Sequence, residues 1–254
     1  MKTRLPQLQQ MITPTPKSVL IIVAHPYDET LWAGGTILSQ PTWTCFVLSL
    51  YRGSDRDSAP KFHNALKILN STGIIDDLNE GSEQEPLDII KAESKILYLL
   101  PKWHFDLIIT HAPTGEYSKH IKHEEVSKAV INLWNTGKVS ANELWTFAYE
   151  NGNEQYYPRP IETAPIYHKL MNRTWLRKQS IITDTYGFKQ NSWEAKTTPK
   201  AETFWQYKNP EEVEMRINQL AQQLTKPAIY QPINTPSLPS LLDWQPKEIS
   251  YTEN

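Results

Sequence analysis

Hydrophobic positions along the chain predict an alternation of short buried strands and amphipathic helices. The strands are continuous apolar runs, which is typical of strands covered on both faces, whereas the helices have apolar residues three or four positions apart. Strands are predicted at residues 18–24, 43–50, 74–78, 105–110 and 143–149, and helices at 30–39, 58–72, 86–100 and 123–136. This alternation indicates a Rossmann-like α/β fold, in which helices cover both faces of a mostly parallel sheet.

Beyond residue 150 the pattern is less regular. We expect a loop at 151–165, helical structure at 168–182, and mixed turn and helix signals at 184–205. An amphipathic helix is predicted at 211–225, because Asn209-Pro210 supplies an N-cap and a proline at the first helical position. Residues 226–247 contain five prolines and are expected to be extended. The sequence thus predicts one domain, 18–205, followed by a C-terminal helix and a Pro-rich extension, 206–254.

Composition and charge are those of an ordinary globular protein. Hydrophobic residues make up 39% and charged residues 21% of the chain, and its net charge is only -2, so no nucleic-acid or anionic-membrane partner is expected. No segment approaches the ~20 apolar residues of a membrane span. The single cysteine, Cys45, excludes an internal disulfide and is expected in the core. Residues 1–17 lack the apolar region of a secretory signal, so we predict a cytoplasmic protein.

Two of the predicted strands end in clusters of residues that can bind metal. The first strand runs directly into Ala24-His25-Pro26-Tyr27-Asp28-Glu29, and the fourth is followed by three histidines within residues 111–123. Such positions line the crevice in which open α/β sheets bind ligands. His25 and Asp28 could hold one divalent ion, or they could simply be polar residues that close a strand. The second cluster, at the same edge of the sheet, favours the metal interpretation.

Together the two clusters resemble the PIG-L/LmbE family of zinc-dependent de-N-acetylases. That family carries an A-H-P-D-D-E element after its first strand and an H-x-D-H element after a later strand. The corresponding residues here are Ala24-His25-Pro26-Tyr27-Asp28-Glu29 and His120-Ile121-Lys122-His123. Further matches are Thr30-Leu31, Gly34-Gly35, Arg52-Gly53 and Gly115-Glu116-Tyr117. The resemblance covers roughly residues 18 to 150 and weakens towards about residue 205.

The resemblance implies a catalytic zinc centre at these two elements. His25, Asp28 and His123 would hold one Zn²⁺ and leave a position open for water. His120 would match the histidine that stabilises the tetrahedral intermediate and transfers protons. The residues expected to contact the substrate are Arg52, Glu29, Glu116 and Tyr117. The implied reaction removes an N-acetyl or other N-acyl group from an amino-sugar conjugate or a similar small molecule.

Two positions depart from the family's motifs. Tyr27 replaces the first Asp, which is the family's general base, and Lys122 replaces the Asp of the H-x-D-H element. Only about one phenol in a thousand is ionised at neutral pH, so Tyr27 is expected to donate a hydrogen bond to the developing oxyanion. His120 is then expected to take the proton, with Glu29 and Glu116 as further candidate bases. Lys122 is expected to be a solvated lysine at the start of a helix.

Three functional interpretations remain. The first, which we predict, is a zinc hydrolase acting on a small N-acylated molecule. The second is a metal-binding family member that has lost turnover, as the missing Asp permits, and that serves as a ligand-binding or regulatory protein. The third is a nucleotide-binding α/β protein, which is disfavoured because Gly34-Gly35 lacks the G-x-G-x-x-G spacing of a phosphate-binding loop. All three are compatible with an oligomer.

Overall fold

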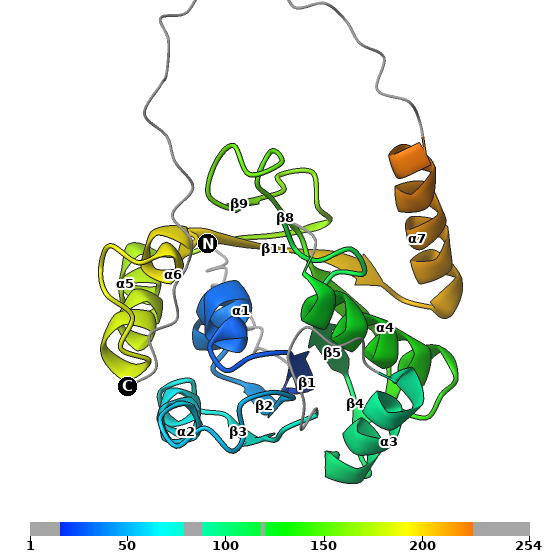
Figure 1. Cartoon of the computed structure of the whole chain (residues 1–254), viewed down its shortest axis with the longest axis horizontal. Coiled ribbons are helices and arrows are strands. Elements are labelled where there is room, and N and C mark those ends of the chain that lie inside the picture. Colours follow the sequence, from blue (N-terminus) through cyan, green and yellow to red (C-terminus); the bar gives the residue numbers. More distant parts are fainter. Residues whose placement is uncertain (1–15, 79–87, 118–119, 226–254) are drawn as a thin grey trace, which may run out of the picture. The chain divides into compact units, whose positions relative to one another are not determined.

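A seven-stranded, mostly parallel sheet forms the centre of the fold (Figure 1). The computed structural model describes residues 16–78, 88–117 and 120–225, and contacts divide the chain into two units, 1–217 and 218–254. The sheet lies in the first unit, with the strand order β10-β11-β7-β5-β1-β2-β3. Its strands are β1 (Lys17–Val23), β2 (Trp43–Ser49), β3 (Thr72–Ile75), β5 (Leu107–Thr110), β7 (Leu144–Phe147), β10 (Ile166–Lys169) and β11 (Ala201–Tyr207). The first five pair in parallel, which confirms the predicted α/β fold.

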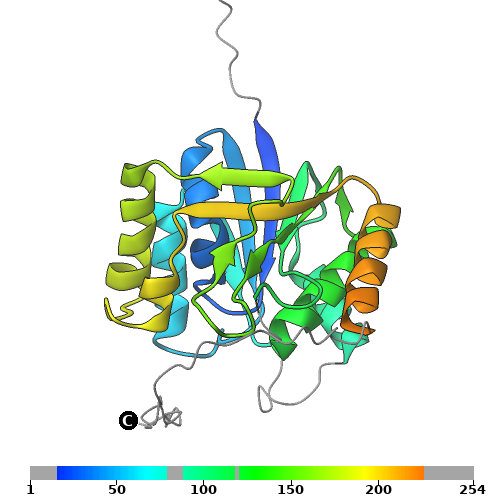
Figure 2. The same cartoon turned by 90° about the horizontal axis from the view of Figure 1, so that it is seen from above.

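Helices cover both faces of this sheet, as Figure 2 shows from above. One face carries α1 (Asp28–Ser39), α2 (Ser58–Ile68) and α5 (Asn172–Ser180), which continues as the π-helix η1 (Ile181–Thr185); the other carries α3 (Ile89–Leu99) and α4 (Ile121–Asn135). Successive side chains of β1 alternate between these two layers: Val19 and Ile21 pack with the first, and Leu20 and Ile22 with the second. Both faces of β1 are therefore buried, which explains its continuous apolar run.

The remaining elements are short or lie at the end of the described chain. They are β4 (His104–Phe105) with β6 (Ser140–Ala141), β8 (Tyr149–Glu150) with β9 (Arg159–Pro160), α6 (Trp193–Thr197) and α7 (Pro210–Thr225). α7 confirms the helix predicted at 211–225, and Cys45 is buried as expected. Among the described helices, none is both long enough and apolar enough to cross a membrane. The predicted extended segment 226–247 and the first residues of the helix predicted at 86–100 lie outside the described residues.

The C-terminal part of the sheet was predicted wrongly. The helix predicted at 168–182 begins only at Asn172, because His168 and Lys169 belong to β10, and β11 (Ala201–Tyr207) lies largely where turn and helix signals were mixed. β11 lies between β10 and β7 and is antiparallel to both. Its pattern is interrupted by the buried Glu202, which is neutralised by Lys178 on α5. Glu202 therefore obscures the apolar pattern of β11 in the sequence, and the residue that neutralises it lies on α5.

The helix predicted at 58–72 also ends early. α2 stops at Ile68, and Asn70 adopts a left-handed backbone conformation with φ 51°. A left-handed residue ends a helix, and asparagine is among the few non-glycine residues that tolerate this conformation. The chain then enters β3 at Thr72, two residues before the start of the strand predicted at 74–78.

Candidate active site

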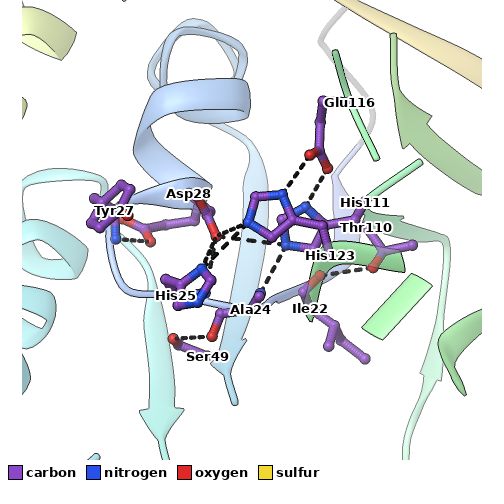
Figure 3. Close-up of polar contacts among 11 residues, drawn as sticks. Ile22, Ala24, His25, Tyr27, Asp28, Ser49, Thr110, His111, Glu116 and His123 are labelled. Atoms are coloured by element: carbon purple, nitrogen blue, oxygen red, sulfur yellow. Dashed lines mark hydrogen bonds and ion pairs between the residues drawn. The ribbon is translucent and has the colours of Figure 1, made fainter. Parts of the chain in front are cut away.

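His25, Asp28 and His123 lie together at the carboxyl ends of β1 and β5, where α1 and α4 begin (Figure 3). Nδ1 of His25 is 3.4 Å from Oδ2 of Asp28 and 3.3 Å from Nε2 of His123, and that Nε2 is 3.4 Å from the same carboxylate oxygen. Tetrahedral ligands at the usual zinc distances of about 2.0–2.1 Å are separated by about 3.3–3.4 Å. The three donor atoms therefore form a triangle of the size that a single zinc ion requires.

A tight turn between β1 and α1 creates one side of this triangle. The His25 backbone N–H donates to Oδ2 of Asp28 at 2.9 Å, so the carboxylate both closes the turn and faces the imidazole. Tyr27, inside the turn, has φ 89°, a left-handed conformation that is strained for a tyrosine. Strain of this kind persists where the surrounding structure imposes it, and it is common at functional sites.

The charge on Asp28 is stabilised by its neighbours. Burial alone would raise the pKa of this carboxyl group, but His123, the hydrogen bond with His25 and the nearby His111 outweigh it. The pKa of Asp28 is therefore held well below its usual range. A carboxylate that remains ionised in a buried position is suited to bind a cation.

Glu116 and His111 both contact His123, and His111 also lies beside the triangle, with its Nε2 3.6 Å from Oδ2 of Asp28 (Figure 3). One oxygen of Glu116 accepts a hydrogen bond from Nδ1 of His123 at 2.6 Å, and the other contacts Nδ1 of His111. Nε2 of His111 in turn accepts from the Ala24 backbone N–H at 2.8 Å. Glu116 is 3% exposed and both of its oxygens are engaged by the two histidines, while its expected contact with substrate stays a prediction.

His111 received no role in the sequence prediction, although it belongs to the histidine-rich segment. It is fully buried and stacks on His123 with 4.0 Å between ring centroids. The signal that could have identified it is its position as the first residue after β5. Two overlapping sets of side chains hold their potential ligand atoms within 4.8 Å of one another: His25 with His120 and His123, and Asp28 with His111 and His123.

Glu29 is also buried rather than directed at the crevice. Its Oε1 accepts hydrogen bonds from Thr30 Oγ1 at 2.5 Å and from the Tyr186 hydroxyl at 2.7 Å. Its Oε2 accepts from the Tyr27 backbone N–H at 3.0 Å. Burial raises the pKa of Glu29 to about 7, but these three donors occupy the carboxylate and hold it in the turn. Glu29 therefore stabilises the β1–α1 turn, and its expected contact with substrate stays a prediction.

His120 presents a nitrogen without a partner at the same place. It is the N-cap residue of α4, and its ring stacks on His123 with 3.9 Å between centroids. Its Nδ1 is buried and accepts or donates no hydrogen bond within the described part of the chain. Burial, followed by the charges of His123 and His25, lowers the pKa of His120 to about 4, so the imidazole is neutral at neutral pH. Buried nitrogens without a partner are uncommon in proteins, and this one points to a bound water or ligand.

Three further predicted site residues are partly exposed near this centre. The ring of Tyr27 packs against Phe188, with 5.0 Å between centroids, and in Figure 3 it lies to the side of the triangle. Burial, with Asp28 adding to it, raises the pKa of Tyr27 far above its usual value, so the phenol remains protonated. Tyr117 packs against both Trp32 and Trp193. Arg52, just beyond β2, has a left-handed φ of 67°.

The prediction for Lys122 is wrong. Its side chain is 2% exposed rather than solvated. Its Nζ lies 3.1 Å from the Glu125 carboxylate and 5.5 Å from the centre of the Tyr51 ring. A carboxylate three residues further along the helix and an aromatic face together offset the cost of removing the ammonium group from water.

Among known sequences, the chain is similar to a viral protein. No family model matches the chain. Over 185 residues it is 21% identical to "Uncharacterized protein L374" of Acanthamoeba polyphaga mimivirus, a match that covers 66% of this chain and 75% of that protein.

Among solved structures, the chain is similar to a deacetylase of the teicoplanin biosynthesis pathway. The two are 15% identical, with a TM-score of 0.51 and coverage of 74% of this chain and 97% of the deacetylase. The 4-carboxy-2-hydroxymuconate hydratase GalB of Pseudomonas putida KT2440 is 16% identical, with a TM-score of 0.47 and coverage of 82% and 88%. At these identities the likeness to the deacetylase is one of fold alone, and it is the fold expected from the resemblance to the PIG-L/LmbE family.

Proposed function

We propose that this protein is a zinc-dependent hydrolase that removes an N-acetyl or other N-acyl group from a small molecule, such as an amino-sugar conjugate. The observation that carries the proposal is the triangle formed by His25 Nδ1, Asp28 Oδ2 and His123 Nε2, with sides of 3.3–3.4 Å. Two imidazoles and one carboxylate are a ligand set found in catalytic zinc sites. The fold shared with a deacetylase supports the same class of reaction.

The residues around the triangle fit a bound zinc ion. The three ligands come from the adjacent carboxyl ends of β1 and β5, and a nitrogen of His120 lies within 4.8 Å of ligand atoms of His25 and His123. When bound, zinc supplies Lewis-acid chemistry: it polarises a carbonyl group and makes water a nucleophile at neutral pH. The unpartnered Nδ1 of His120 is consistent with a bound group next to these ligands.

His120 is proposed as the residue that moves the proton. Its imidazole is neutral at neutral pH, so Nδ1 can accept a proton and later return it to the leaving amine. Glu29 and Glu116 do not share this role, because hydrogen bonds occupy their oxygens. Tyr27 keeps its proton, so it does not serve as the general base, and its hydroxyl can donate a hydrogen bond to the substrate.

Substrate contact is proposed for Arg52 and Tyr117. Both are partly exposed: Arg52 lies beyond the carboxyl end of β2 and Tyr117 beyond that of β5, the two strands that flank β1. The guanidinium group of Arg52 can bind an anionic or polar group, and the ring of Tyr117 can pack on the apolar face of a sugar.

The direct test is hydrolysis of N-acetylated amino sugars by the purified protein. We expect acetate release that depends on added Zn²⁺ and disappears in His120→Ala, while His168→Ala, a change in a half-buried histidine that hydrogen-bonds Thr36, retains it. Zinc binding without acetate release from a panel of N-acylated sugars would favour the ligand-binding alternative. Release that is equally fast in excess chelator would contradict the proposed metal dependence.

A further inference from the structure

We infer that Glu116 and His111 form a hydrogen-bonded support that holds the two histidine ligands in place and keeps His111 itself from binding the metal. This inference rests on the proposed function, since it concerns the same metal centre. It assigns different roles to two buried histidines, His111 and His123, that are equally close to Asp28 (Figure 3).

The first step concerns which nitrogen of His123 carries the proton. An ionised carboxylate only accepts hydrogen bonds, so the 2.6 Å contact with Glu116 requires the proton to be on Nδ1 of His123. In the neutral ring, Nε2 then carries a lone pair, and it is Nε2 that faces Asp28 and His25. Glu116 therefore fixes His123 in the tautomer that can bind a metal ion.

The same reasoning gives His111 the same tautomer, but its lone pair is already used. Its Nδ1 contacts the other oxygen of Glu116 and so carries the proton, which leaves the lone pair on Nε2. That lone pair accepts the hydrogen bond from the Ala24 N–H at 2.8 Å. Although Nε2 of His111 lies only 3.6 Å from Oδ2 of Asp28, binding an ion there would leave a buried backbone N–H without a partner.

The support reaches both histidine ligands. Ala24 directly precedes His25, so the hydrogen bond to His111 anchors the backbone from which that ligand projects. Ser127, one turn after His123 on α4, donates to the backbone carbonyl of His111 at 2.7 Å. The ends of β1 and β5 and the first turn of α4 are thus tied together through one carboxylate and one imidazole. Because this network is buried, its hydrogen bonds are strong and costly to break.

The two histidines also differ in what they can offer a dication. Nε2 of His123 has a lone pair that is free to bind the ion. Nε2 of His111 already accepts a hydrogen bond from the Ala24 N–H, so His111 contributes only through its hydrogen bond to Glu116. The buried carboxylates of Asp28 and Glu116 together carry two negative charges, which matches the charge of one divalent ion. Three protein ligands, rather than four, then surround the ion, and a position remains open for the reacting groups.

The inference is tested by zinc binding to the full-length protein and four variants. Dissociation constants are measured by competition with a chromophoric chelator, and the visible spectrum of the Co²⁺ form reports the number of ligands. We expect His123→Ala to lose the site, whereas His111→Ala and Glu116→Gln keep one ion per chain but bind it about 10- to 100-fold more weakly. Glu143→Gln is the matched control, because it changes another carboxylate that accepts several hydrogen bonds, far from the site, and should leave zinc affinity unchanged.

A fifth variant, His111→Asn, tests the inference even if Glu116→Gln does not fold. His111→Asn retains a donor towards Glu116 but loses the acceptor for Ala24, so its affinity should fall less than that of His111→Ala. Loss of the ion from His111→Ala as complete as from His123→Ala would make His111 a ligand and overturn the inference. A Glu116→Gln variant that binds zinc as tightly as Glu143→Gln would overturn it as well. If the wild-type protein itself binds no zinc, the proposed function fails first.

Discussion

The buried ion pair between Lys178 and Glu202 gives a sharp prediction about what stabilises the helix that carries Asp28. Both side chains are fully buried, with Nζ of Lys178 2.6 Å from Oε1 of Glu202. The same carboxylate accepts the backbone N–H groups of Gly35 at 2.8 Å and Thr36 at 2.6 Å, in the middle of α1. Lys178→Met would leave the Glu202 charge buried with only two backbone donors.

The expected cost follows from burial. Removing one partner of a buried pair typically costs about 3–5 kcal/mol, because the remaining charge has lost both water and its counter-charge. In a protein of this size each kcal/mol lowers the melting temperature by about 2–4 °C, so Lys178→Met should melt about 6–20 °C lower. The free energy of unfolding is measured by urea titration of the wild type and the variant.

A second ion pair of the same length provides the control. Nζ of Lys61 is also 2.6 Å from a carboxylate oxygen, that of Asp57, but the Asp57 side chain is 77% exposed. Exposed pairs contribute at most about 1 kcal/mol, so Lys61→Met should change stability by no more than that. If the two Lys→Met variants lose equal stability, burial does not determine the strength of the Lys178–Glu202 pair and the reasoning is refuted.

Three further predictions concern the site. Chelation should lower the melting temperature only by the loss of bound zinc, because the ligands lie in the β1–α1 turn and the first turns of α1 and α4, above a sheet whose core is packed without them; loss of the helical circular dichroism signal at room temperature would contradict this. The depressed pKa values of Asp28 and Glu116 stabilise the fold above the ordinary carboxyl pKa of about 4, so the chelated protein should lose stability as the pH falls below that value, and Asp28→Asn should flatten the profile of melting temperature against pH. Tyr27→Phe should lower kcat by about 10²-fold with zinc content unchanged, whereas an unchanged kcat would exclude a donor role for the phenol.

The parallel half of the fold could be predicted because its signals are local. β1 is buried on both faces by the two helix layers, so its sequence is an uninterrupted apolar run that needs no knowledge of its partners. The turn that follows places His25 and Asp28 at the strand's carboxyl end, where ligands bind in such sheets. Strand ends and residue types placed two clusters of possible metal ligands at one edge of the sheet, and the resemblance to the PIG-L/LmbE family then selected His25, Asp28 and His123 among them.

Other features depend on partners far away in the chain and could not be predicted. Glu202 breaks the apolar pattern of β11, and only its contact with Lys178 makes it compatible with a buried strand. Glu29 is enclosed by the Tyr186 hydroxyl, 157 residues away. Lys122 can be buried because its ammonium group contacts the Tyr51 ring and the Glu125 carboxylate. In each case a charged residue normally found in solvent is buried because a distant side chain compensates for the loss of water.

The metal content of the protein tests the central claim most directly. Wild-type protein and a His25→Ala/His123→Ala double variant are equilibrated with Zn²⁺, freed of unbound metal by gel filtration, and analysed by mass spectrometry of the elements. The triangle of His25, Asp28 and His123 predicts about one zinc ion per chain in the wild type and none in the double variant. Stoichiometric zinc in the double variant, or none in the wild type, would contradict it.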